Sequence, residues 1–444
     1  MLILSMGIAS RAQWYTGMSQ KTGLALCIHL TDTSAELYSP MQTTEPLPVS
    51  SWSLDGNKLT IESKKLGFKT VLGKAEANWK GYWKQGLLKE DITFLPTDTI
   101  FQMRRPQNPL PPYRFDEETV TVDYVDSQGN PVHLEGTLTY PKGGGRYPCM
   151  VLVSGSGQQN RDEELMQHKP FLVLADYLAS RGIAVLRYDD RGVGASTGSL
   201  DEATTHLFSE DAEAMFDAVK RSTHVDTARL GIGGHSEGGA IAPMVAARNK
   251  DVKFVVMLAG QGCTGAEVLE QQGAALLRAK GVSDRLIYVR QKCMDYIWGS
   301  MFNSGKKLSQ KDIQEIIKVH TSGLTKDEVD SIGFGRGAAY TMAQQLSSPW
   351  MIHFYSETNP MDYLPRVTCP VLAINGSKDL QMIAHPNLDR IKALCPQADC
   401  RELQGLNHLF QHCTTGMPDE YMLIEETFAP EAMETIATFI NARK

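Results

Sequence analysis

The sequence has little that would bind nucleic acid, a structural metal or the interior of a membrane. It contains no dense run of Lys or Arg, and its formal net charge at pH 7 is −7, which argues against nucleic acid and anionic lipid surfaces as partners. None of its eight cysteines forms a C-x-x-C pair, so the usual signature of a zinc site is missing. Beyond the N-terminus, no apolar run is long enough to span a bilayer.

The cysteines are compatible with either a reducing or an oxidising compartment. Three of them lie in or beside apolar strand signals, where a free cysteine behaves as a small hydrophobic residue: Cys27, Cys149 and Cys369. In an exported protein, Cys395 could form a disulfide with Cys400, or either of them could pair with Cys413. Both possibilities stay open at the level of the sequence.

The first residues are similar to the end of a secretory signal. Residues 1–9 are mostly apolar, and Ser10-Arg11-Ala12 puts small residues where a signal peptidase reads, before Gln13. The basic start of such a signal is missing. Residues 1–12 therefore predict export to the periplasm or the cell exterior, and the alternative is a frayed apolar N-terminus on a cytoplasmic protein.

Two domains are expected in this chain of 444 residues, whose 42% hydrophobic and 21% charged content is typical of a globular protein with a large core. Residues 13–103 contain several short strand signals, with a hairpin signal at Asp55-Gly56-Asn57-Lys58, and predict a small all-β domain, sandwich or barrel-like. Residues 104–114 are rich in proline, which resists both helix and sheet, and predict a linker.

Residues 115–444 alternate between strand and helix signals. A hairpin is expected first, with its turn at residues 126–130. Continuous apolar strands then alternate with amphipathic helices, which predicts an α/β domain with a mostly parallel sheet covered on both faces. The alternation stops between about residues 263 and 350, where only helical patterns occur, so we expect an inserted helical cap there.

A short glycine-rich turn is the strongest chemical signal in this domain. Residues 234–238 fit G-x-S-x-G directly between a strand and a helix, the context of a nucleophile elbow, and predict Ser236 as a nucleophile. Residues 194–198 also fit the pattern. Ser196 lies well past its strand, however, and no helix starts at it, so we interpret it as a loop residue.

Five segments in this order resemble an α/β-hydrolase, in particular the serine aminopeptidase-like subgroup with bacterial esterases that carry a β-rich N-terminal domain. They are residues 154–162, 188–196, 234–238, 375–379 and 405–408. One departure is that many relatives have His-Gly where this chain has Ser154-Gly155. The resemblance implies an α/β-hydrolase fold and a serine-dependent hydrolase.

The family order Ser, then Asp or Glu, then His implies the other two members of a catalytic triad. Asp379 follows the strand signal at residues 371–374, and His408 follows another at residues 400–403. His412 is the rival base, and with His408 it would form a metal-like pair if the segment were helical, but no third ligand accompanies them. His235 cannot fold back onto its neighbour's oxygen and still be correctly oriented.

Two backbone amides are expected to stabilise a developing oxyanion. One is the amide of Glu237, at the start of a helix, and the other is the amide of Ser156, in a loop where Gly155 and Gly157 let the backbone approach. Losing one such donor typically costs about 2.7–4 kcal/mol of barrier. A phosphate-binding loop is the alternative for residues 154–157, but the Gly-Lys-Ser/Thr ending is missing.

The sequence favours a serine hydrolase that acts on a small-molecule carboxylic ester, with no metal or organic cofactor implied. An aminopeptidase or amidase of the same fold is the first alternative, since acidic residues of the cap such as Glu267 and Glu270 could hold a substrate amine. Thioester hydrolysis, dinucleotide binding through Gly231 and Gly233, and a non-catalytic binding protein are more distant alternatives.

Overall fold

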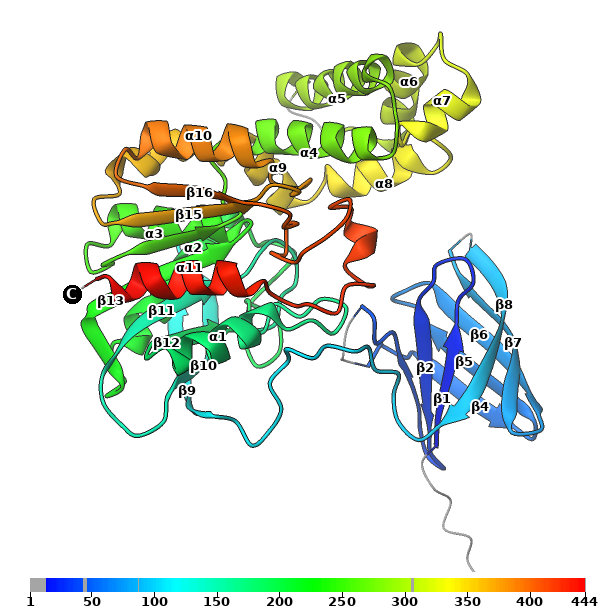
Figure 1. Ribbon diagram of the computed structural model, residues 1–444. Coiled ribbons are helices and arrows are strands. Elements are labelled where there is room, and N and C mark those ends of the chain that lie inside the picture. The colour runs from blue at the N-terminus through cyan, green and yellow to red at the C-terminus, as the bar shows by residue number, and fades with distance from the viewer. Residues whose placement is uncertain (1–12, 43–45, 87, 305–306, 444) are drawn as a thin grey trace, which may run out of the picture. The chain divides into compact units, whose positions relative to one another are not determined.

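The structure is a computed structural model that describes residues 13–42, 46–86, 88–304 and 307–443. The predicted signal remnant, residues 1–12, lies outside these ranges. The chain forms two compact units (Figure 1). The N-terminal unit contains the chain up to Pro106 together with residues 164–168, and the C-terminal unit contains residues 107–163 and 169–444. No helix among the described residues is long and apolar enough to cross a membrane.

The N-terminal unit is one antiparallel sheet of eight strands in the order β3-β2-β1-β8-β7-β6-β5-β4. Its strands are β1 (Gln13–Met18), β2 (Ala25–Leu30), β3 (Ala35–Tyr38), β4 (Ser51–Asp55), β5 (Lys58–Ser63), β6 (Phe68–Ala75), β7 (Asn78–Gln85) and β8 (Leu88–Thr97). Strand β8 pairs with β7 along residues 88–94 and with β1 along residues 95–97, so the sheet turns a corner at β8. The expected hairpin at residues 55–58 joins β4 to β5.

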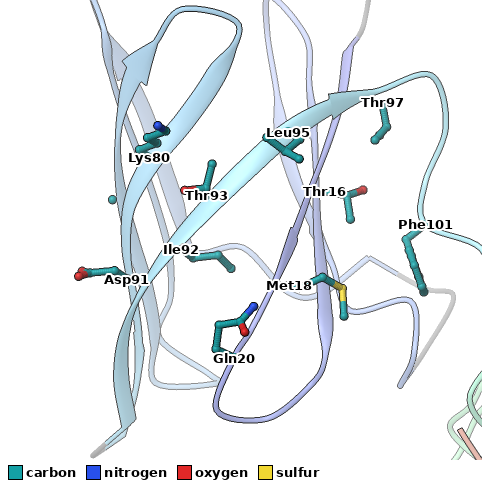
Figure 2. Close-up of a pocket in the computed structure, with 11 residues that line it drawn as sticks. Thr16, Met18, Gln20, Lys80, Asp91, Ile92, Thr93, Leu95, Thr97 and Phe101 are labelled. Atoms are coloured by element: carbon teal, nitrogen blue, oxygen red, sulfur yellow. The ribbon is translucent and has the colours of Figure 1, made fainter. Parts of the chain in front are cut away.

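A hollow with a volume of 870 Å³ lies on strands β1, β7 and β8 of this unit, and Figure 2 shows residues that line it. Its wall is mixed, with the half-exposed Met18 and Leu95 beside the charged Lys80 and Asp91. No serine, cysteine or histidine is among the residues that line it. The chemistry predicted from the sequence therefore has to be sought in the C-terminal unit.

The C-terminal unit is built on a mixed eight-stranded sheet in the order β16-β15-β14-β13-β11-β12-β10-β9. Its strands are β9 (Phe115–Val125), β10 (Pro131–Pro141), β11 (Tyr147–Val153), β12 (Ala184–Tyr188), β13 (Val225–His235), β14 (Val255–Leu258), β15 (Val371–Gly376) and β16 (Asp399–Leu403). The β9–β10 hairpin and the β10–β12 pair are antiparallel, and the remaining pairs are parallel. The carboxyl ends of β11, β13, β14, β15 and β16 consequently meet at one edge.

Helices cover both faces of this sheet. They are α1 (Pro170–Ser180), α2 (Thr205–Val219), α3 (Gly238–Arg248), α10 (Ala384–Leu394) and α11 (Pro430–Asn441). Successive residues of β11 point to opposite faces: Val151 packs in a core with α2, α3 and α10, whereas Leu152 packs in a core with α1 and α11. The predicted fold class, an α/β domain with a helical insertion plus an all-β unit, is confirmed (Figure 1).

The insertion between β14 and β15 is helical, as expected. It contains α4 (Gly265–Ala279), α5 (Asp284–Ser304), α6 (Gln310–His320), α7 (Lys326–Ser331), α8 (Ala338–Gln345) and α9 (Pro349–Glu357), followed by 3₁₀ turns at Pro360–Asp362 and Leu364–Arg366; a further 3₁₀ turn spans Pro418–Glu420. Thr264, Ser309 and Thr325 each form a capping box that begins a helix. The insertion continues past the expected end near residue 350, because Pro349 begins a helix rather than ending one.

Candidate active site

Ser236 stands on a sharp turn between the end of β13 at His235 and the start of α3 at Gly238. Its φ of +54° lies in the left-handed region, which a serine rarely adopts. A Cβ on Gly234 would lie 2.2 Å from the oxygen of Gly238, and a Cβ on Gly238 would lie 2.2 Å from the oxygen of Val153. Both glycines are therefore required for the chain to turn this tightly.

The second G-x-S-x-G serine has a different environment. Ser196 is 6% exposed; its hydroxyl donates to the carbonyl of Asp189 at 2.8 Å and accepts from the amide of Glu135 at 3.0 Å. The first bond joins two residues of the loop after β12, and the second fastens that loop to β10. The hydroxyl is thus used in structure, in accord with the interpretation of Ser196 as a loop residue.

His408 and Asp379 form a buried pair. Nδ1 of His408 lies 2.8 Å from Oδ2 of Asp379, and the two residues are 5% and 3% exposed. The other carboxylate oxygen of Asp379 accepts the amides of Gln381 and Met382, both at 2.8 Å. These bonds fix the carboxylate, so that Nδ1 of His408 carries the proton and Nε2 is left as the basic atom.

His412, the rival base, lies apart from this pair. It is exposed, and its ring nitrogens contact Glu426 and Glu431, each at 2.9 Å. The segment from Leu409 onward is not helical, so the hypothetical shared helical face of His408 and His412 does not form. Among the described residues, no group of three or more His, Cys, Asp or Glu side chains is arranged to hold a metal ion.

The loop after β11 runs beside Ser236. A Cβ on Gly155 would lie 3.3 Å from the Cβ of Ser236, so only glycine allows this approach without displacement. The amide of Gly155 donates to Glu163 at 2.6 Å and is therefore engaged, whereas Ser156, the next residue, is exposed in the loop. Glu237 is the cap residue directly before α3, at the end of the helix where the first amides have no partner within the helix. The roles of Ser156 and Glu237 as oxyanion donors stay predictions.

Ion pairs connect the loops around this edge of the sheet, as the charged motifs near residues 160 and 190 suggest. Arg161 contacts Asp189 at 2.6 Å and Glu135 at 3.0 Å. Arg191 contacts Asp126 at 3.1 Å and Asp211 at 2.7 Å, and all three side chains are almost fully buried. Asp190 is different, since it accepts from the Ser154 hydroxyl at 2.6 Å and from the amide of Gln159 at 3.0 Å.

Two residues at this site were not indicated by sequence motifs. Glu163, at a positive φ of 50°, contacts His235 at 2.9 Å, and His235 also contacts the carbonyl of His408. Trp350 of α9 donates to both oxygens of Glu237, at 2.8 and 3.0 Å. Burial raises the pKa of Glu237 although the hydrogen bonds from Thr205 and Trp350 oppose the shift.

The eight cysteines are all free in the structure, including the three considered for disulfides, Cys395, Cys400 and Cys413. Burial raises the pKa of the Cys395 and Cys413 thiols, and that of Cys400 to about 11, which keeps them protonated and unreactive near neutral pH. None of them takes part in the arrangement around Ser236.

The helical insertion has a cavity of its own, with a volume of 470 Å³, between α4, α5, α8 and α9. Its wall is mainly apolar and includes Trp298 and Tyr355, whose rings stack with their centroids 3.8 Å apart. Glu267, Glu270 and Asp295 also line it. Glu267 is already engaged in capping α4 and in an ion pair with Arg390 at 3.3 Å.

Comparison with known proteins shows which families and proteins this chain is similar to. A family model described as serine aminopeptidase, S33 matches residues 168–296, a range that contains Ser236. Esterase EstD of Thermotoga maritima is 29% identical over 303 residues, which are 67% of this chain and 61% of that protein. The chain thus spans less than two thirds of the length of this curated relative.

The solved structures that the chain matches are more distant in sequence. A hypothetical protein from Pseudomonas aeruginosa is 18% identical with a TM-score of 0.46, over 78% of this chain and 99% of that one. Est1E from Butyrivibrio proteoclasticus, solved with ferulic acid bound, is 18% identical with a TM-score of 0.40, over 72% of this chain and 98% of that one. The chain is thus similar to the serine aminopeptidase family over residues 168–296 and to Esterase EstD over 303 residues, and these two likenesses accompany its mixed sheet and the turn at Ser236.

Proposed function

We propose that this protein is a serine esterase that hydrolyses small carboxylic esters through a Ser236-His408-Asp379 triad. One observation carries the proposal: Ser236 has the left-handed φ of a nucleophile elbow, and the residue before it, His235, contacts the loop that holds the buried His408–Asp379 pair. The serine, the base and the acid thus come from adjacent loops at one sheet edge. Esterase EstD, named for the same reaction class, supports an ester as substrate.

In the first step, Nε2 of His408 takes the proton from the Ser236 hydroxyl while the Ser236 oxygen attacks the ester carbonyl. Asp379 holds Nδ1–H of the ring and stabilises the imidazolium that forms. The amides of Glu237 and Ser156 donate to the carbonyl oxygen as it becomes negative. His408 then gives its proton to the departing alcohol, and an acyl group remains on Ser236.

In the second step, water replaces the alcohol. His408 takes a proton from the water, the hydroxide attacks the acyl carbonyl, and the same amides again stabilise the oxyanion. The carboxylic acid leaves as Ser236 regains its proton. Every group that the two steps require belongs to this chain.

The test is a series of p-nitrophenyl esters of increasing acyl length, with Ser236→Ala and Ser196→Ala as a matched pair. Each variant removes a hydroxyl from a G-x-S-x-G sequence. We expect Ser236→Ala to lower kcat by at least about 1,000-fold, because nucleophile removal abolishes the acyl-enzyme route. Ser196→Ala should keep most of the activity. Full activity in Ser236→Ala, with loss in Ser196→Ala, would contradict the assignment.

Cleavage of an aminoacyl amide is the second candidate, and two observations favour it. The matched family is described as serine aminopeptidase, and the cavity in the helical insertion presents Glu270 and Asp295 beside two aromatic rings. Such a wall could hold a substrate ammonium group by charge and by cation–π attraction. Aminoacyl-nitroanilides assayed beside the esters discriminate the two functions. Turnover of the anilides alone would favour the peptidase, and thioesters extend the same comparison.

A further inference from the structure

Both ring nitrogens of His235 face hydrogen-bond acceptors. Nδ1 lies 2.9 Å from Oε1 of Glu163, and Nε2 lies 2.9 Å from the carbonyl oxygen of His408. A neutral imidazole has a single N–H and can donate only one of these bonds. The His235 and Glu163 side chains are 8% and 7% exposed, so water cannot readily replace either partner. Two donated bonds require a ring that carries both protons.

We propose that His235 is a buried imidazolium which, paired with Glu163, positions the loop of the catalytic base and the oxyanion loop relative to Ser236. This inference rests on the proposed function, because it assigns His235 and Glu163 as positioning residues for that reaction. Neither side chain supplies a group to the bond-breaking steps. We call the two residues together the Glu163–His235 clamp.

Through Glu163, the clamp contacts the loop after β11 that contains Ser156. Its Oε1 accepts from His235 and also from the amide of Gly155 at 2.6 Å. One carboxylate oxygen therefore fixes the backbone of residue 155, and the next residue is Ser156, the expected oxyanion donor. A Cβ on Gly155 would lie 3.1 Å from this oxygen, so the close approach depends on glycine.

Through His235, the clamp contacts His408, the proposed base. Asp379 fixes His408 through the ring, whereas His235 fixes it through the backbone carbonyl. The His235 ring also packs against the His408 ring, with centroids 4.7 Å apart, and against the ring of Phe410 at 6.3 Å. A displacement of about 1 Å between reacting groups can cost about 100-fold in rate, so an anchor on this backbone bears directly on kcat.

The charges around His235 support the protonated form. The titratable groups that face it are Glu163, His408 and Asp379, and its remaining ring neighbour, Phe410, is apolar. Burial, the largest single influence, lowers the pKa of His235, but the charge and hydrogen bond of Glu163, the hydrogen bond to the His408 carbonyl and the charge of Asp379 together raise it above its ordinary value. The clamp should consequently open as the pH rises through this raised pKa.

The kinetic test compares Glu163→Gln and His235→Gln with His224→Gln in the full-length chain. His224 is a histidine stacked on Tyr140 at 4.0 Å, away from Ser236, and serves as the control. We expect His235→Gln to lower kcat by about 10- to 100-fold with KM within about threefold. His224→Gln should match the wild type in both constants. Loss of ester turnover in Ser236→Ala, measured in parallel, tests the proposed function separately.

The pH profile separates positioning from a structural role. Glu163→Gln keeps an oxygen that can accept from Gly155 but removes the negative charge beside His235. Its kcat/KM should equal that of the wild type within about threefold near pH 6 and should fall at a lower alkaline pH than in the wild type. His235→Gln should lose this alkaline transition. Identical profiles in the wild type and both variants would overturn the clamp while leaving the function of Ser236 intact.

A direct measurement decides the charge of His235 even if a variant fails to fold. Histidine-selective ¹⁵N labelling of the wild-type protein, with the His235 signal identified by its loss in His235→Gln or by its coupling to Glu163, gives the shifts of both ring nitrogens. Two protonated nitrogens at pH 7 are expected. A neutral ring at His235 would refute the proposal regardless of any kinetic result.

Discussion

At the scale of the residue, a backbone torsion distinguishes two serines that the same sequence pattern describes. Ser236 has a φ of +54°, and the glycines on both sides allow the turn, whereas Ser196 uses its hydroxyl to fasten β10 to a loop. Ser236 is partly exposed, whereas its neighbours His235 and Glu237 are buried. Such strain persists only where the neighbouring structure enforces it, and it is common at functional sites.

Asp379→Asn is expected to lower kcat for p-nitrophenyl esters by about 10³- to 10⁴-fold. An amide at this position can present its NH₂ group to Nδ1 of His408, which would place the ring proton on Nε2 and remove the base. KM should change little, because Asp379 is buried behind His408. The matched control is Asp399→Asn on β16, whose carboxylate pairs with Arg401 at 2.6 Å near the surface. Equal losses in the two variants would argue against Asp379 as a member of the triad.

Residues that follow a strand in a short motif were predictable, and residues that act through the fold were not. Ser236 directly follows the buried end of β13, Asp379 lies three residues after the buried β15, and His408 lies five residues after the partly exposed β16; the parallel sheet brings the ends of these strands together. Glu163 and His235 are 72 positions apart, and no local pattern marks Glu163. Its contact with His235 arises from the path of the loop after β11, which a single sequence does not specify.

At the scale of the element, helix α9 connects the helical insertion to the nucleophile turn. Trp350 on α9 donates to Glu237, and Thr205 of α2 donates to the same carboxylate at 2.5 Å. The carboxylate of Glu237 is therefore held by two helices that flank the turn. Because α9 also lines the cavity through Met351 and Tyr355, the position of this helix links the cavity wall to Ser236.

Trp350→Phe should destabilise the C-terminal unit more at pH 8 than at pH 5. The folded pKa of Glu237 is raised by burial above an unfolded value of about 4.3, so its contribution to stability is complete below that value and is lost as the pH rises through the folded pKa. Removing the indole N–H takes a partner from the ionised form and raises that pKa further. We expect a loss of about 1–3 kcal/mol at pH 8, measured as a lower thermal midpoint.

The double variant Trp350→Phe with Glu237→Gln is the control for this pH dependence. A glutamine cannot ionise, so the difference in midpoint between pH 5 and pH 8 should shrink toward that of the rest of the protein. If the single variant shows the same loss at both values of pH, the Trp350–Glu237 bond does not depend on the charge of the carboxylate.

Helices and strands could be predicted where the residues at their ends or on their faces follow a clear pattern. Helices α1 and α3 lie in the region where amphipathic helices were expected, and each begins at a proline or glycine, Pro170 and Gly238. Strands β1 and β4 carry polar residues on an exposed face and gave no clear signal. Helix α9 was not predicted, because the expected insertion ended near residue 350, whereas Pro349 begins this helix.

At the scale of the whole molecule, the chain leaves the C-terminal unit after Glu163 and returns to it at Lys169. The five residues between belong to the N-terminal unit. There, the Gln167 side chain donates to the carbonyls of Pro40 and Phe101, each at 3.0 Å, and accepts from the amide of Met103 at 2.6 Å. The division of the chain falls at Pro106, and nothing in the sequence indicated this excursion.

Gln167→Ala is expected to reduce ester turnover although Gln167 lies outside the C-terminal unit. It removes three hydrogen bonds from a segment that begins immediately after Glu163, and each bond contributes about 0.5–1.5 kcal/mol. A less ordered segment should let Glu163 move, so we expect kcat to fall severalfold with KM unchanged. Gln85→Ala removes a surface bond to Leu66 in the same unit and should leave kcat at the wild-type value. Equal kcat in both variants would show that the excursion does not influence Glu163.

This excursion also has a consequence for the order in which the protein is made. Gln167 bonds to Pro40 across 127 positions of sequence, so the N-terminal unit cannot complete its contacts until the ribosome has released the chain beyond residue 168. Most of the all-β sheet is synthesised long before then. Until Gln167 has been synthesised, the backbone carbonyl of Pro40 lacks this hydrogen bond. We expect the two units to finish folding in a coupled sequence, in which the first unit to emerge becomes complete only after the second has begun.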